Sequence, residues 1–183
     1  MTPEKNRQRR LPLSDGERGE AALFVIGFAV TIILWACAHD LYLIGVEPRH
    51  FTVYHRSLLP LSNHALLALQ YATVATLGPG MVFGAITFAV CRLGRWSRLG
   101  FWPAWLLFLP FVALIEAAAL GVGHYAAHRF EAGLAPPYPE ALYPDSTAGI
   151  AYTQSVNITA YLGAALFGGL YQLVLFLVRL RRA

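Results

Sequence analysis

The sequence is poor in charge. Only 13% of its 183 residues are Asp, Glu, Lys or Arg, about half the share found in ordinary soluble domains, whereas 57% are hydrophobic. Such a chain has too few charges to cover a surface that faces water, so its composition predicts a protein whose main partner is the lipid bilayer. Membrane topology then explains the net charge of +4, and no nucleic-acid partner is needed.

Cysteine is scarce as well. Cys37 and Cys91 each lie toward the end of their apolar run, the first and the second. Because these two runs would cross the membrane in opposite directions, the cysteines fall toward opposite sides of it. A disulfide needs Cα atoms within about 7 Å, and these two would lie a membrane thickness apart. No CxxC pair, glycine-rich phosphate loop or Ser-His-Asp order occurs. Thiol redox chemistry is therefore excluded, and the sequence gives no positive sign of an enzyme.

Long apolar runs, by contrast, dominate the chain. Four of them cover about residues 21–44, 64–91, 101–124 and 150–178, and a helix needs about 20 mostly apolar residues to cross a bilayer. The runs are continuous, whereas transmembrane strands alternate between apolar and polar residues. We predict an all-α membrane protein: a single four-helix transmembrane domain over residues 21–183, preceded by a cytoplasmic basic tail over residues 1–20.

The basic residues predict the orientation of the bundle. Eleven of the 14 lie before the first run, between the second and third, or after the fourth, which leaves Arg49, Arg56 and Arg129 on the other side. The positive-inside rule then places both termini in the cytoplasm. Residues 45–63 and the proline-rich 125–149 would form a small, irregular extracytoplasmic cap. Because arginine far outnumbers lysine, we expect a bacterial coding bias and hence the inner membrane.

Small residues and one proline mark two special places in the runs. Pro79, in the GPG stretch at 78–80, predicts a kink that is either static or a gating hinge. In the last run Ala164 and Gly168 are four apart, and so are Ala165 and Gly169. Such pairs let helices approach closely, either inside the bundle or in a homo-oligomer or larger membrane complex.

The polar residues gather toward the outer side. Glu116 lies inside the third run, where a charged group facing lipid is costly, so we expect it to face the bundle interior. Asn157 and Gln154, three apart on the last run, are its expected hydrogen-bond partners. The predicted pocket consists of Glu116, Asn157, Gln154, Gln70, Tyr152 and Tyr161.

All six histidines also fall on the outer side. His124 and His128 are four apart, a spacing that can chelate a transition metal. His39 and His64 can complete such a site or ligate haem across the bundle. The alternative is that these histidines bond only water or headgroups, and the sequence favours a protein without a cofactor.

Two classes of function stay open. The first is an accessory or scaffold subunit that binds partner proteins and catalyses nothing. The second is a protein that handles a small ligand, a metal or protons in an outward-facing polar pocket around Glu116 and the outer histidines. The first is favoured because the chain is short and carries no specific motif.

Overall fold

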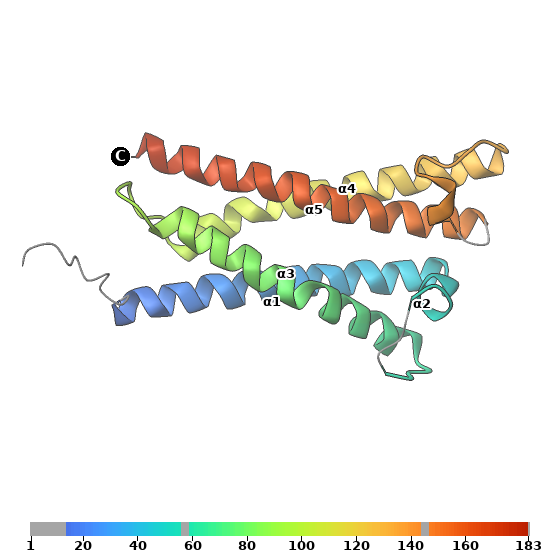
Figure 1. The fold of residues 1–183 in the computed structure, drawn as a ribbon, viewed down its shortest axis with the longest axis horizontal. Helices are drawn as coiled ribbons and strands as arrows, with labels where there is room; N and C mark the ends of the chain where they lie inside the picture. Colours follow the sequence, from blue (N-terminus) through green and yellow to red (C-terminus); the bar gives the residue numbers. More distant parts are fainter. Residues whose placement is uncertain (1–13, 56–58, 144–146, 183) are drawn as a thin grey trace, which may run out of the picture.

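The computed structural model describes residues 14–55, 59–143 and 147–182, and within these ranges the chain forms helices and no strand. The helices are α1 (Asp15–Val46), α2 (Arg49–Thr52), α3 (His64–Arg92), α4 (Phe101–Glu131), the short 3₁₀ helix η1 (Glu140–Leu142) and α5 (Ala148–Arg181). Four of them, α1, α3, α4 and α5, are long and apolar enough to cross a membrane. The predicted all-helical fold with four long apolar helices is confirmed (Figure 1).

The helices extend beyond the apolar runs that predict them. The first begins at Asp15, inside the range assigned to the basic tail, of which residues 1–13 lie outside the described ranges. Helix α4, from the third run, continues past residue 124 to Glu131 and ends before Gly133, whose φ of 69° suits a helix terminus. Side-chain oxygens of Asn63 and Thr147 cap α3 and α5. Hydropathy locates the apolar part of each helix, whereas capping and backbone hydrogen bonds decide where the helix ends.

The bundle consists of two helix pairs. Helix α1 packs mainly on α3, and α4 packs mainly on α5. Figure 1 shows the start of α1 and the end of α5 at one end of the bundle, which we call the terminal end. Helix α2 and η1 lie at the opposite end, which we call the loop end. The single turn α2, which the sequence analysis did not predict, folds back onto α1 and α5 there.

Glycine permits the close crossing of α1 and α3. A Cβ atom at Gly84 would lie 2.6 Å from the carbonyl oxygen of Phe24 and 2.8 Å from the Cα atom of Val25. One turn earlier, a Cβ atom at Gly80 would lie 3.0 Å from the Cα atom of Ala29. The two backbones therefore touch along this stretch, as small residues four apart allow.

The terminal half of the bundle is filled by aromatic rings. Phe28 lies at the centre, with its ring centroid 5.2 Å from that of Phe108 and 5.8 Å from that of Phe101, both edge-on. The hydroxyl of Tyr171 donates to the carbonyl oxygen of Ala104 at 2.8 Å. Edge-to-face pairs of this kind add to the stabilisation that burial alone provides. We call this tightly packed group of rings around Phe28, Phe108 and Tyr171 the aromatic plug.

Contacts of three arginines hold the terminal end together. Glu17 on α1 accepts hydrogen bonds from Arg92 on α3 and from Arg98 in the following loop. Arg179 on α5 is only 1% exposed. Its guanidinium donates to four backbone carbonyl oxygens around the α3–α4 loop, those of Val90, Leu93, Trp96 and Ser97. Arg179 therefore fastens that loop to the last helix.

Large apolar side chains cover the outer surface of the long helices. Leu34 is 65% exposed, Trp102 is 64% exposed and Leu166 is 62% exposed. A surface so rich in exposed apolar groups suits contact with lipid or with another protein rather than with water. Both cysteines are free thiols.

Candidate functional site: a carboxylate cluster beside a chamber

Glu116, near the middle of α4, is bonded to two donors on α1. Its Oε2 atom accepts from Trp35 Nε1 at 2.9 Å and from His39 Nδ1 at 2.9 Å. The His39 side chain is 4% exposed and that of Glu116 is 27% exposed. A carboxylate can only accept, so Nδ1 of His39 carries the shared hydrogen. We call Trp35, His39 and Glu116 the carboxylate cluster.

The inward placement of Glu116 agrees with the sequence analysis, but its expected partners are wrong. Among the described residues, Glu116 bonds the indole and imidazole of α1 rather than Asn157 or Gln154 of α5. The reason is rotational: Trp35 and His39 are four apart and share one face of α1, and that face meets α4. The Trp-xxx-His spacing, four residues apart in the first apolar run, is the sequence signal that could have identified this pair, and the sequence analysis did not use it.

Asp40 adds a second acid to the neighbourhood. It follows His39 on α1 and lies close enough for its charge to interact with those of His39 and Glu116. The sequence analysis did not select this residue. Two carboxyl groups therefore share the surroundings of one buried imidazole, so a positive charge or a proton is favoured at this level of the bundle.

A chamber of about 360 Å³ lies between the two helix pairs. All four long helices contribute to its walls. Its polar residues are Trp35, His39, Asp40, Thr76, Asn157 and Tyr161. The rest of the lining is apolar and includes Ile32, Phe83, Phe108, Val112 and Ile115. The chamber therefore has a polar region beside the carboxylate cluster and a larger apolar region next to the aromatic plug.

Small residues on α3 and α5 leave room for this chamber. Ala75 and Pro79 on α3, with Ala164 and Ala165 on α5, are exposed wall residues, whereas none of the wall residues on α1 or α4 is. The open side is thus on the flank of the bundle between α3 and α5, although the sequence analysis expected a pocket that opens outward. Of the predicted small-residue pairs, Gly168 also lines the chamber and Gly169 has open space around it.

The other predicted pocket residues have separate roles. Asn157 and Tyr161 line the chamber, whereas Gln154 is half-buried outside its walls. The hydroxyls of Tyr152 and Tyr42 lie 2.8 Å apart, so Tyr152 joins α5 to α1. The side-chain oxygen of Gln70 accepts from the backbone N–H of Leu59 at 2.7 Å and holds the loop before α3.

The histidines proposed as metal or haem ligands are not brought together. His39 is buried against Glu116, while His64, His124 and His128 are exposed. The ring of His124 packs edge-on against that of Tyr152, with 5.0 Å between centroids. Over the residues that the structure describes, no three His, Cys, Asp or Glu side chains are grouped in a way that could hold a metal ion. The geometry thus gives no support to the transition-metal or haem hypothesis.

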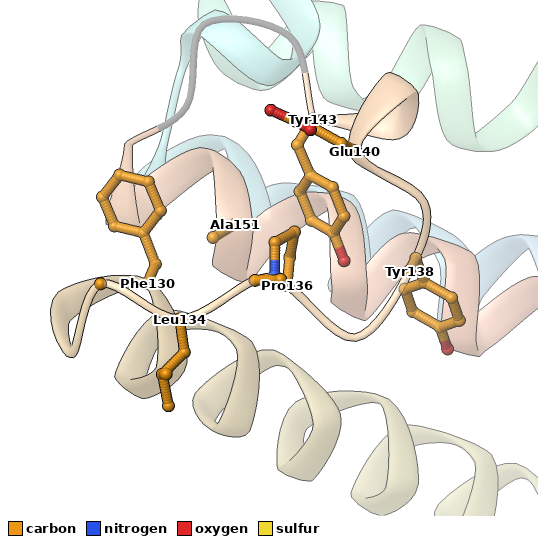
Figure 2. A pocket seen from close by; sticks show the side chains of 9 residues that line it. Phe130, Leu134, Pro136, Tyr138, Glu140, Tyr143 and Ala151 are labelled. Carbon is orange, nitrogen blue, oxygen red and sulfur yellow. The ribbon is translucent and has the colours of Figure 1, made fainter.

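A second hollow, of about 440 Å³, lies at the loop end between the end of α4 and the chain that returns to α5. Figure 2 shows Phe130, Leu134 and Tyr143 among the side chains around it. A tyrosine anchors this returning chain to α5, because the hydroxyl of Tyr143 lies 2.7 Å from the hydroxyl of Ser155. Burial raises the pKa of Tyr143, so its hydroxyl keeps its proton and stays available as a donor.

Arg49, at the start of α2, pairs with Glu47 and also bonds the N-cap residue of α5. Arg49 donates to both carboxylate oxygens of Glu47 at 3.1 Å, and its Nη2 atom also donates to the hydroxyl of Thr147 at 3.1 Å. The hydrogen bonds from Arg49 hold the pKa of Glu47 below its usual range. This contact ties the start of α2 to the start of α5.

Comparison of the chain with protein families, with curated proteins and with solved structures finds no match. The carboxylate cluster and the chamber are therefore the features from which a function can be inferred.

Proposed function

We propose that this protein is a multi-pass protein of the bacterial inner membrane that binds a small amphipathic molecule in the chamber between its helix pairs. The observation that carries the proposal is the lining of the chamber. His39, Asp40 and Asn157 lie in its polar region, and Phe83 and Phe108 lie in its apolar region. Its volume of about 360 Å³ falls within the range of small-molecule sites, roughly 300–1,000 Å³.

The surface and the charges support the membrane placement. Exposed leucines cover the long helices, and of the nine arginines that the structure describes all but Arg49 and Arg129 lie at the terminal end. The positive-inside rule then puts both termini in the cytoplasm. Helix α2, η1 and the segments around them would form the extracytoplasmic cap.

The lining also selects the chemistry of the ligand. Asp40 lines the chamber and Glu116 lies just behind His39, so the polar region favours a cationic or hydrogen-bond-donating head group. The exposed wall residues on α3 and α5 face the surrounding lipid, so a hydrophobic molecule would enter from the bilayer through the flank. A lipophilic amine has both properties.

Photolabelling tests this function. A diazirine-labelled alkylamine is incubated with the protein in lipid nanodiscs, irradiated, and the labelled peptides are identified by mass spectrometry. We expect labels on the chamber walls of α3 and α5. The variant Ala164→Phe, which fills the chamber, should lose them, whereas Leu166→Phe, on an exposed face of the same helix, should keep them. Labelling spread evenly over the four helices, or unchanged in Ala164→Phe, would refute the proposal.

The accessory-subunit hypothesis stays a prediction. It would use Ala164, Ala165, Gly168 and Gly169 to pack against another chain. Three of these residues line the chamber and the fourth, Gly169, has open space around it. The geometry therefore favours these small residues as the wall of a ligand site rather than as a contact with another chain.

A further inference from the structure

Three histidines lead from the loop end of the bundle to Glu116. His55 follows α2 and is half-buried, His50 lies within α2, and His39 lies on α1. The ring centroids of His55 and His50 are 4.7 Å apart. Both His39 and His55 lie close enough for their charges to act on His50. The sequence analysis placed His50 and His55 on the outer side and gave them no role.

The ring nitrogens between these histidines are buried and have no partner among the described residues. His50 is 0% exposed, and neither of its ring nitrogens has a hydrogen bond to a described residue. The same holds for Nε2 of His39, which is 5% exposed. A buried polar group without a partner costs about 1–3 kcal/mol. Polar atoms clustered in this way are the usual site of bound water, which makes about three hydrogen bonds to such groups.

Other polar atoms lie beside the same three rings. The hydroxyl of Tyr71 on α3 is buried and has no hydrogen-bond partner among the described residues. Its ring packs edge-on against that of His55, with 5.5 Å between centroids. The polar lining thus comes from α1, α2 and α3 together, so it belongs to the packed structure and not to one loop.

The hydrogen-bond partners of His55 and His39 determine the tautomer of each ring. His55 Nδ1 lies 2.6 Å from the backbone carbonyl oxygen of His50. A carbonyl oxygen accepts, so Nδ1 carries the hydrogen and Nε2 is the basic nitrogen. The same logic applied to His39, whose Nδ1–H donates to Glu116, leaves Nε2 as its basic nitrogen. Both rings therefore present Nε2 to an incoming proton.

We propose that His55, His50 and His39, with water molecules between them, form a proton relay from the loop end to Glu116. A proton from solvent binds Nε2 of His55, and the protonated ring passes a proton through water to one nitrogen of His50. His50 releases a proton from its other nitrogen toward Nε2 of His39. His39 then gives its Nδ1 proton to Oε2 of Glu116. One proton enters, one carboxylate becomes a carboxylic acid, and only N–H and O–H bonds change.

The surroundings of His50 suit transfer rather than storage of a proton. The pKa of His50 is lowered to about 3, mainly by burial and in addition by the charges of His55 and His39, while the charge of Glu47 opposes these effects. A proton on this ring is therefore short-lived. At the other end of the relay, His39 and Asp40 from α1 face Glu116, and Tyr152 from α5 interacts with it.

The relay ends at the carboxylate cluster. Beyond it, toward the terminal end, the bundle is filled by the aromatic plug around Phe28, Phe108 and Tyr171. The relay is thus an inlet from one side and not a channel through the bundle. It goes beyond ligand binding, since it concerns how the cluster exchanges protons and needs no molecule in the chamber.

Stopped-flow fluorescence tests the relay. The reporter is Trp35, which donates to Glu116 and whose ring centroid is 5.6 Å from that of His39. A variant with Trp35 as its sole tryptophan is placed in lipid nanodiscs and jumped from about pH 8 to about pH 5, the range in which histidine titrates. We expect His50→Phe to slow the change in Trp35 emission at least about tenfold, or ~1.4 kcal/mol in barrier. The exposed control His128→Phe should leave the rate unchanged.

Two further results decide the proposal. His55→Phe changes a half-buried ring and should slow the emission change in the same way, which keeps the test valid if His50→Phe does not fold. Equal rates in wild type, His50→Phe and His55→Phe would overturn the relay, and so would a Trp35 emission that ignores pH. Photolabelling of the chamber by the alkylamine should be unaffected by His55→Phe, so failure of the relay is distinguishable from failure of the ligand site.

Discussion

His50 makes the folded protein sensitive to acid. The ring is 0% exposed and burial is the main cause of its low pKa, about 3 against an ordinary value of 6.5. The folded state therefore holds His50 neutral, whereas the unfolded chain binds a proton as the pH falls below 6.5. The contribution of His50 to stability is complete above pH 6.5 and is lost progressively as the pH falls toward 3.

The size of this effect follows from the two pKa values. At about pH 5 the unfolded state gains roughly 2 kcal/mol from protonating this one ring, because its pKa lies 1.5 units above that pH. The folded state gains almost nothing there, and this holds for any folded pKa below about 4. The prediction depends on the burial of His50 and not on the fine value of its pKa in the folded state.

The variant His50→Phe isolates this contribution. Unfolding in mixed micelles at about pH 8 and about pH 5 should show that wild type loses roughly 2 kcal/mol more than His50→Phe between the two conditions. The control His128→Phe, at an exposed ring, should follow wild type. The difference between two pH values removes any change in packing that phenylalanine causes at both. Parallel losses in wild type and His50→Phe would show that His50 is not held neutral and buried.

Two contacts elsewhere give sharper tests of the packing. Gly84→Ala should destabilise the protein by about 1–3 kcal/mol in thermal unfolding, because the added methyl meets the backbone of α1 at Phe24. Gly78→Ala, which meets nothing within 4 Å, should be neutral or stabilising by about 0.5–1 kcal/mol; equal effects would contradict the crossing described. Arg179→Lys should cost about 2–4 kcal/mol, because an ammonium cannot reproduce the forked bonds to the loop carbonyls. Arg181→Lys, on the exposed surface, should change little, and a similar loss in both would exclude the loop-fastening role.

Much of the fold could be predicted from apolar length alone. Lipid-length hydrophobic runs located the four long helices, because a helix must bury about 20 apolar residues to cross a bilayer. The ends were misplaced, since α4 continues to Glu131 on backbone bonding after its apolar run stops. The turn α2 was missed because it has four residues and no apolar period of its own.

The sequence was enough to predict that Glu116 faces the bundle interior, but not which side chains it bonds there. The cost of a charge in lipid correctly turned Glu116 inward. Its partners depend on how each helix is rotated about its axis, and that rotation is set by contacts such as Gly84 against Phe24, which hydropathy does not encode. His50 shows the same limit, because a histidine in a connecting segment looks solvent-exposed until α2 folds it beneath the loop end.

The two halves of the bundle differ for one physical reason, the size of the side chains that face each other. In the terminal half, Phe28, Phe108 and Tyr171 meet from three helices and leave little space. In the other half, small residues such as Ala75 and Ala164 face each other across α3 and α5 and leave the chamber. A molecule or a proton that reaches Glu116 must then return on the side from which it came, unless the aromatic rings move apart. The aromatic plug therefore favours the proposed binding site over a pore.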